Sequence, residues 1–381
     1  MTYSLDKSQK AIQKAAFEFA KGEFDGDAAR ESDQKGIFPE VTWSKAAELG
    51  FIGIHHPEKY SGGGLGHLEH VLIAEVFTTS DSTLGAAIML AGLASEWIVQ
   101  FGTDTQKKML LPEIYEGRKK TGIALDGIPL GNNDDGVSFK NENSSDHSLI
   151  TGELKHVING KDAEIVPVLC YHFEGGRLTD KCSMLLLDGK SPGITMGKEY
   201  SLLGLRATGM TSYFLKNVGS NHIHIFTPKD NQLLKIQSAF YLLMAALALG
   251  TAQGAFDRAM AHVKDREQFG KKLAGFQVIQ HKLARMALQI EQSRCLTYIA
   301  ANHADSKKVD TKMPVMANLA ATKTAVEVSY ESIQLLGGYG YTTEYDVERC
   351  YRDAKALQIL SGHEHELLDQ VSAGLIGRLH K

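Results

Sequence analysis

The sequence lacks an excess of basic residues. Its 381 residues include 41 Lys and Arg against 45 Asp and Glu, which gives a formal net charge of −4. Nucleic-acid binding depends on Lys and Arg that neutralise backbone phosphates, so this balance argues against a nucleic-acid partner. Prolines are few, with eight in the chain, while hydrophobic and charged residues make up 43% and 23%. These proportions are typical of a folded globular protein and argue against a long disordered tract.

Long hydrophobic runs are also missing. The longest strongly apolar run, residues 239–250, is shorter than the roughly 20 residues that a membrane span needs. The N-terminus has no apolar segment and carries acidic residues early, including Asp6 and Glu18, which argues against a secretory signal or a transit peptide. The four cysteines are widely spaced without a C-x-x-C pair, so we expect reduced thiols. These features predict a cytoplasmic protein without a membrane span.

Several motifs of well-known sites are absent as well. No G-x-G-x-x-G follows an expected strand, and neither G-x-x-x-x-G-K-[ST] nor G-x-S-x-G occurs, which argues against a nicotinamide-dinucleotide fold, a P-loop and an α/β-hydrolase. The sequence has closely spaced histidine pairs, but none of them has a third potential ligand at a spacing typical of metal sites. We therefore predict no metal site. These pairs are His67/His70, His222/His224 and His363/His365.

The residues that are present divide the chain into three blocks. Residues 1–118 have helical periodicity, including the stretches 68–76 and 84–101, and contain a glycine-rich loop at 61–66. Residues 119–230 hold short β-type runs between clusters of Gly, Asn, Asp and Pro. Residues 231–381 return to helical periodicity, with long helices expected at 231–264, 272–304 and 313–336. The β-type runs lie at 165–173, 183–187, 212–218 and 222–226.

Two apolar series in the last block predict buried helical faces, because their members recur every three or four residues. The second series continues until two glycines, at 337 and 338, which predict the end of its helix. The first series is Phe276, Ile279, Leu283, Met286 and Ile290, and the second is Met316, Leu319, Lys323, Val326, Tyr330 and Ile333.

Two segments of this block allow a structural or a functional interpretation. From composition alone, Asp265-Arg-Glu-Gln-Phe-Gly270 is typical of a solvated connection between helices. The stretch Gln334-Leu-Leu-Gly-Gly-Tyr-Gly340 fits a glycine helix cap followed by a turn. Its glycines would equally allow a close approach of the backbone to a phosphate.

Taken together, these stretches resemble the acyl-CoA dehydrogenase family. Upstream matches at Phe38-Pro39, Pro57-Glu58 and Gly204-Leu-Arg206 extend the resemblance over essentially the whole chain. It implies an α+β multidomain fold with an N-terminal helical domain (1–118), a middle β-barrel or sandwich domain (119–230) and a C-terminal four-helix bundle (231–381). The most specific motifs are Arg266-Glu-Gln-Phe-Gly270, Phe276-Gln277 with Leu283-Ala-Arg-Met286, and Gln334-Leu-Leu-Gly-Gly-Tyr-Gly-Tyr341. Further matches are Glu344-Tyr345, Val347-Glu-Arg349 and Tyr351-Arg-Asp-Ala-Lys355.

The resemblance implies FAD as cofactor, an acyl-CoA substrate and an electron-transferring flavoprotein as electron acceptor. In the family reaction a carboxylate base removes the α-proton while the β-hydrogen leaves as hydride to the flavin. The usual glutamate position is Ser361 here, and a serine hydroxyl needs a base of its own. The family's alternative position falls near Phe240 or Tyr241, and neither is acidic. Candidates for a relocated base are Glu364, which is a weak one, His363 and Asp126.

The two halves of the implied flavin site differ. The loop beside the flavin ring, residues 125–134, and the segment 156–159, His-Val-Ile-Asn, depart from the family pattern. The residues that the family uses for the ADP half of a neighbouring subunit's FAD match it. They are Arg266, Phe269, Gln277, Gln334, Gly337 and Gly338.

This asymmetry favours a base-deficient subunit of a heteromeric enzyme, which shares FAD with a homologous catalytic partner in a heterotetramer. A self-sufficient homotetramer with a relocated base, and a non-catalytic CoA- or flavin-binding protein, are the alternatives. The resemblance implies a dimer of dimers built from the long C-terminal helices. We expect the acyl group near residues 88–93 and 240–244, where Ala91, Gly92 and Ala94 would leave a roomy pocket.

Overall fold

The N-terminal part of the computed structural model is helical. The structure describes residues 5–125, 138–140, 149–174, 177–219, 223–226, 232–305 and 311–376. Helix ends are defined by local capping: Asp6 and Gln9 form a reciprocal capping box, as do Thr103 and Gln106. The helices are α1 (Lys7–Glu23), α2 (Gly26–Lys35), α3 (Glu40–Glu48), α4 (His67–Ser80), α5 (Ser82–Leu90), α6 (Ser95–Phe101) and α7 (Asp104–Tyr115).

The helical stretch expected over residues 84–101 is interrupted. Helix α5 ends at Leu90 and α6 begins at Ser95. Gly92 lies in the intervening turn, where any added Cβ would overlap the side chain of Ile52. The prediction of one continuous helical stretch was therefore wrong, because this tight contact with the preceding loop requires a turn and a glycine.

The middle part forms one eight-stranded sheet with the order β6-β7-β3-β2-β4-β5-β8, in which β1 pairs with β3. The expected β-type runs correspond to β4, β5, β7 and β8. Strand β3 was missed because its sequence, LITGELKHVI, has a polar, glycine-containing middle that interrupts its apolar residues and breaks the alternation expected of a strand. The strands are β1 (Ile123–Ala124), β2 (Ser138–Lys140), β3 (Leu149–Ile158), β4 (Val166–Glu174), β5 (Arg177–Leu187), β6 (Ile194–Met196), β7 (Met210–Gly219) and β8 (Ile223–Phe226).

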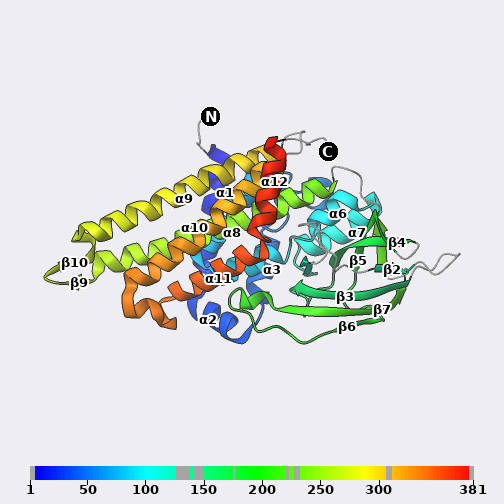
Figure 1. Cartoon of the computed structure of the whole chain (residues 1–381), viewed down its shortest axis with the longest axis horizontal. Helices are drawn as coiled ribbons and strands as arrows, with labels where there is room; N and C mark the ends of the chain where they lie inside the picture. Colours follow the sequence, from blue (N-terminus) through cyan, green and yellow to red (C-terminus); the bar gives the residue numbers. More distant parts are fainter. Residues whose placement is uncertain are drawn as a thin grey trace.

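The C-terminal part is helical again, and Figure 1 shows its long helices α8, α9 and α10 extending away from the sheet. A two-stranded hairpin, β9 (Glu267–Gln268) and β10 (Lys271–Lys272), joins α8 to α9 at the end far from the sheet. The order of helical, β and helical blocks confirms the predicted fold class. The helices are α8 (Gln232–Asp265), α9 (Gln277–Ala304), α10 (Lys312–Leu336), α11 (Val347–Leu360) and α12 (Glu364–Ile376).

Two described stretches, Ser82–Phe101 and Gln232–Asp265, are long and apolar enough to cross a membrane by length and composition. Buried residues make up 89% and 78% of their most apolar windows. Helix α8 packs against α4, α9, α10 and α11. A helix that is apolar on all sides is expected when other helices surround it, so both stretches have the surroundings of core helices.

The two apolar series of the C-terminal block have different outcomes. In α9, Leu283, Met286 and Ile290 are buried, as the periodicity predicts. In α10 the helix forms as predicted, but its stripe is only partly buried: Leu319, Val326 and Ile333 pack against the core, whereas Lys323 and Tyr330 are exposed. The most buried face of α10 consists mainly of small residues, which allow the helices to approach closely. These small buried residues include Ala317, Ala321, Ala325, Ser329 and Ser332.

Candidate functional site

A cavity of about 930 Å³ lies between the sheet and the C-terminal helices. Its sheet side includes Leu125, His156 and Met210, and the loop 202–205 closes the same wall. Its helical side comes from α10, α11 and the start of α12. The α10 members are Leu319, Thr322, Lys323, Val326 and Glu327. Three members of the α10 series, Leu319, Lys323 and Val326, therefore line this cavity.

Helix α11 stabilises this junction through one of the motifs of the family resemblance, Tyr351-Arg-Asp-Ala-Lys355. Arg352 forms a bidentate pair with Asp33 of α2 at 2.9 and 2.7 Å, and it also donates to the carbonyl of Leu203. Next to it, Asp353 is fully buried and accepts from the backbone N–H of Leu205 at 2.6 Å. The motif thus fixes α11 to the N-terminal helices and to the cavity wall, so its arginine and aspartate are structural.

The position expected for the catalytic glutamate is turned away from the cavity. Ser361 caps the end of α11, is 1% exposed and does not line the cavity. Its Oγ lies 2.9 Å from Asn318 Oδ1 and 2.8 Å from the carbonyl oxygen of Leu357. These contacts place the hydroxyl inside the helical bundle.

Two carboxylates of the described residues do reach the cavity. Glu364, the weak candidate for the base, is exposed at the first residue of α12, and Glu327 lies on α10. His363 also lines the cavity, whereas Asp126 lies outside the described residues. A carboxylate can therefore face this cavity from α12 although none does so from position 361.

Each segment that departs from the family pattern contributes one described residue to the lining of the same cavity. Of residues 156–159, only His156 lines it, and its ring stacks on Tyr200 with centroids 5.8 Å apart. Val157 and Ile158 are in the core, and Asn159 has a φ of 55°. Leu125 is the single described member of the 125–134 loop, and it lines the cavity.

The residues matched to the ADP half of FAD lie at the other end of the bundle, around the β9–β10 hairpin (Figure 1). Phe269 is 92% exposed at the hairpin turn with a φ of 53°, and its ring meets that of Phe276 beside Gln277. Arg266 lies over the ring of Tyr339, 5.6 Å from its centroid. The structure therefore brings the hairpin close to the segment that follows α10.

This second region is open enough for a dinucleotide. Gln334 is exposed near the end of α10, and Gly337 and Gly338 have no atom within 4 Å of an added Cβ. Counting 1.5 Å per residue, Gly337 lies about 20 Å along α10 from the cavity-lining Lys323. Exposed polar groups and open backbone fit a phosphate-bearing ligand, and their distance from the cavity suits a ligand held mainly by another subunit.

The residues expected to surround the acyl group, 88–93 and 240–244, do not line this cavity. Ala91, Phe240 and Tyr241 are in the hydrophobic core, and none of them lines the cavity. Small residues there allow close packing of helices instead of leaving space.

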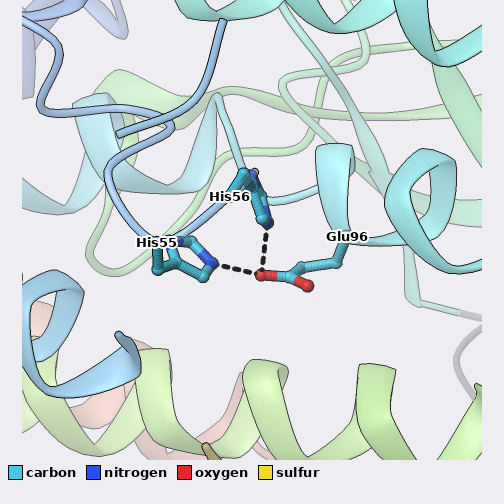
Figure 2. Close-up of side chains that lie close together, drawn as sticks. All are labelled: His55, His56 and Glu96. Atoms are coloured by element: carbon cyan, nitrogen blue, oxygen red, sulfur yellow. Dashed lines mark hydrogen bonds and ion pairs between the residues drawn. The ribbon is translucent and has the colours of Figure 1, made fainter. Parts of the chain in front are cut away.

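A separate cluster of polar side chains is buried among the N-terminal helices. His55 Nε2 and His56 Nε2 lie 2.5 and 3.0 Å from the same oxygen, Oε1 of Glu96, as Figure 2 shows. Burial, together with His56, lowers the pKa of His55 to about 4. Burial opposes ionisation of Glu96, but the two histidines outweigh it and hold the pKa of Glu96 well below its usual range.

This cluster was missed in the sequence because its members are 40 and 41 positions apart. The prediction of no metal site considered only closely spaced histidine pairs, and the described structure brings together three possible ligands that those pairs do not include. The adjacent histidines at 55 and 56 were the available signal, since a doublet in a loop can direct two rings to one point.

A neighbouring pair, His67 and Asp305, predicts a pH-dependent contribution to stability. His67 Nδ1 lies 2.7 Å from Asp305 Oδ1, and the two side chains are 24% and 38% exposed. Burial lowers the pKa of His67, but the hydrogen bond to Asp305 and the charges of Glu96 and Asp305 outweigh it, so the pKa is raised. Burial likewise opposes the ionised Asp305, yet the contacts from His67 lower the pKa of that carboxyl.

The raised pKa of His67 gives stability that is fully present below about pH 6.5 and is lost as the pH rises through the folded value. The lowered pKa of Asp305 gives stability that is present above about pH 4 and is lost on acidification. A double-mutant cycle with His67→Gln and Asp305→Asn in urea should therefore give a coupling of about 0.5–1 kcal/mol near pH 5.5 and less near pH 9. Equal coupling at both pH values would contradict the assignment.

Comparison with known proteins agrees with this architecture. Residues 6–118 match the N-terminal domain, and residues 241–376 the C-terminal domain, of acyl-CoA dehydrogenases. The chain belongs to the acyl-CoA dehydrogenase family. It is 31% identical over 371 residues to the caffeyl-CoA reductase–Etf complex subunit CarC of Acetobacterium woodii, covering 94% of this chain and 95% of CarC.

Two further relatives cover nearly the whole chain. The probable acyl-CoA dehydrogenase YngJ of Bacillus subtilis is 32% identical over 366 residues, covering 95% of this chain and 96% of YngJ. The structure of butyryl-CoA dehydrogenase from Megasphaera elsdenii superposes with a TM-score of 0.89 at 28% identity, covering 99% of this chain and 100% of that one. The resemblance to an oxidoreductase family is thus confirmed, and so is FAD as the cofactor of that family.

Proposed function

We propose that this chain binds a CoA thioester and the flavin ring of FAD in the 930 Å³ cavity and takes part in α,β-oxidation or reduction of the acyl group. We further propose that it is the base-deficient subunit of a heteromeric enzyme. The observation that supports this second step is Ser361, which occupies the position where the resemblance implies the base and whose hydroxyl is hydrogen-bonded inside the bundle. A homologous subunit with a glutamate at that position would be the catalytic partner and would act in its own cavity, while this chain would lend its ADP-binding residues to the FAD that the two share.

The chain's own residues would bind and orient the ligands. Apolar side chains such as Leu319, Val326 and Leu367 line the cavity and would exclude water from the acyl group, while Lys323 and Lys355 add positive charge to its helical wall. At the other end of the bundle, Arg266 and the open backbone at Gly337 and Gly338 would hold the ADP half of a neighbour's FAD. FAD supplies the hydride transfer when it is bound.

The surface of the long helices supports assembly. Val278 and Leu288 on α9 and Tyr330 on α10 are 62%, 57% and 56% exposed, which leaves apolar side chains for another subunit to cover. The similarity to CarC, a subunit of a caffeyl-CoA reductase–Etf complex, supports an electron-transferring flavoprotein as redox partner.

Bleaching of the flavin by acyl-CoA thioesters tests the proposal. The chain alone should be poor in flavin and should show no bleaching with any thioester of a panel. Co-expression with a glutamate-bearing homologue should give a yellow complex that an acyl-CoA bleaches. Bleaching by the purified lone chain would contradict the base-deficient role, and binding without bleaching in every combination would favour a non-catalytic function.

Replacing Ser361 by glutamate should not rescue the lone chain. The new side chain would begin beside Asn318, where the serine hydroxyl is 1% exposed, so a carboxylate would be buried there or be forced to turn. An uncompensated buried carboxylate is unfavourable. The variant would also keep the segment 156–159, which departs from the family pattern. We expect no bleaching by Ser361→Glu under the same assay. An increase in bleaching by orders of magnitude would show instead that the serine is the single defect.

A relocated base is the second candidate, because Glu364 lines the cavity. In that case the wild-type chain would bleach by itself, and Glu364→Gln would abolish bleaching while leaving acyl-CoA binding intact. Glu366→Gln is a matched control, since Glu366 lies in the same first turn of α12 but does not line the cavity.

A further inference from the structure

The buried cluster of His55, His56 and Glu96 has the composition of a metal site. Its three possible ligand atoms, one nitrogen from each ring and one carboxylate oxygen, all lie within 4.8 Å of one another. Two imidazoles with one carboxylate are a ligand set that binds Zn²⁺. We propose that these three residues bind one divalent transition-metal ion, with Zn²⁺ as the ion of first choice.

The charges around Glu96 support the proposal. Asp33, Glu75 and Asp81 are buried carboxylates, and each forms an ion pair with an arginine. Glu96 is equally buried, with a side chain that is 5% exposed, yet its ion-pair partners among the described residues are two histidines. Asp353, which is also fully buried, accepts hydrogen bonds from Ser82, Thr83 and the backbone of Leu205 instead. The Glu96 carboxylate hydrogen-bonds only with the two rings among the described residues, and a bound cation would compensate its charge.

The surroundings hold the rings in place. Tyr115 Oη lies 2.5 Å from Nδ1 of His56, which is the contact that commonly orients a metal-binding imidazole through its other nitrogen. The ring of His70 stacks on that of His55 with centroids 4.1 Å apart. The loop that carries both histidines is closed by backbone hydrogen bonds, including Gly63 N to Gly53 O and Gly64 N to His56 O.

The geometry needs small shifts of the ligand atoms to accept an ion, since the three atoms lie within 4.8 Å of one another but not at the spacing of bound ligands. Ligands at about 2.0–2.1 Å from a tetrahedral Zn²⁺ are roughly 3.3 Å apart. Glu96 Oε1 is 2.5 and 3.0 Å from the two nitrogens, so the carboxylate would move back by less than about 1 Å to make room. Figure 2 shows Oε1 between the two rings and the second oxygen turned away from both. A water molecule or that second oxygen can complete the coordination.

The ion would be structural. None of its three ligands lines the large cavity, and they connect the loop after α3 to α6. Joining two elements that are about 40 residues apart in the chain stabilises the folded state, since the unfolded chain offers no preformed site. The site therefore does not depend on the proposed function of the flavin cavity.

The first experiment measures zinc in the purified full-length chain, without an affinity tag that contains histidine. After exposure to Zn²⁺ and dialysis against metal-free buffer, we expect one zinc ion per chain by mass spectrometry. Glu96→Gln and His56→Gln should each remove it, whereas His281→Gln, an exposed histidine on α9, should retain it. Tyr115→Phe should weaken zinc binding about 10- to 100-fold by removing the orienting contact.

A second measurement covers the case in which a ligand variant does not fold. X-ray absorption at the zinc edge of the wild-type chain should show nitrogen and oxygen ligands near 2.0–2.2 Å with imidazole scattering and without sulfur. A wild-type chain that retains no zinc, sulfur ligation, or full zinc content in folded Glu96→Gln and His56→Gln would each overturn the proposal.

Discussion

Replacing Arg349 by methionine is expected to lower the free energy of unfolding by about 3–5 kcal/mol, because it leaves a buried charge without its partner. The Arg349 side chain is 3% exposed and pairs with Asp81 at 2.8 Å and Asp346 at 3.1 Å. Asp81 is buried too, and it caps α5 by accepting from the N–H groups of Thr83 and Leu84. The pair therefore joins α11 to the N-terminal helices beside the cavity.

Urea denaturation followed by circular dichroism measures this effect. Arg118→Met is the matched control, since Arg118 pairs with Glu113 and Glu116 on the surface, where such a pair contributes about 0–1 kcal/mol. Adding Asp81→Asn to Arg349→Met should restore part of the stability, because asparagine still caps the helix and no charge is left buried. Equal losses for Arg349→Met and Arg118→Met, or no restoration in the double variant, would contradict the role of the pair.

Hydrophobic periodicity predicted the fold class because long helices with one apolar face have a clear signature. The α9 series at Leu283, Met286 and Ile290 is an example, and all three residues are buried. In α10 the same rule predicted the helix but not its most buried face, because residues such as Ala321 and Ser329 form that face and carry little hydrophobic signal. An apolar stripe indicates a helix face that is shielded from water. Such a face can line a ligand cavity as well as a hydrophobic core.

The candidate site was predicted less completely, because its chemistry depends on contacts between distant residues. The motif around Arg352 was recognisable, but its structural role depends on Asp33 in α2. In the same way, the direction of Ser361 follows from its contact with Asn318, 43 positions away. The buried carboxylate of Glu96 is met by rings from a loop 40 residues earlier, and no local pattern marks that distance.

Replacing Arg266 by alanine is expected to weaken FAD binding in the assembled oligomer by about 1.5–3 kcal/mol, the usual contribution of a charge-assisted hydrogen bond. This corresponds to a loss of roughly 10- to 100-fold in affinity. Arg266 is exposed next to the β9–β10 hairpin, and its guanidinium lies over the ring of Tyr339, which holds it without neutralising its charge. No described carboxylate forms an ion pair with it, so the charge is available to a pyrophosphate.

The FAD content of the purified oligomer and fluorescence titration of the stripped protein measure this loss. Arg266→Lys should also lose affinity, since an ammonium cannot form the paired hydrogen bonds of a planar guanidinium. Lys264→Ala removes one positive charge at the end of α8 and should leave binding nearly unchanged, which separates a specific contact from general electrostatics. If Arg266→Ala retains FAD as well as Lys264→Ala does, Arg266 is a solvated arginine, and the hairpin has no part in holding a neighbour's cofactor.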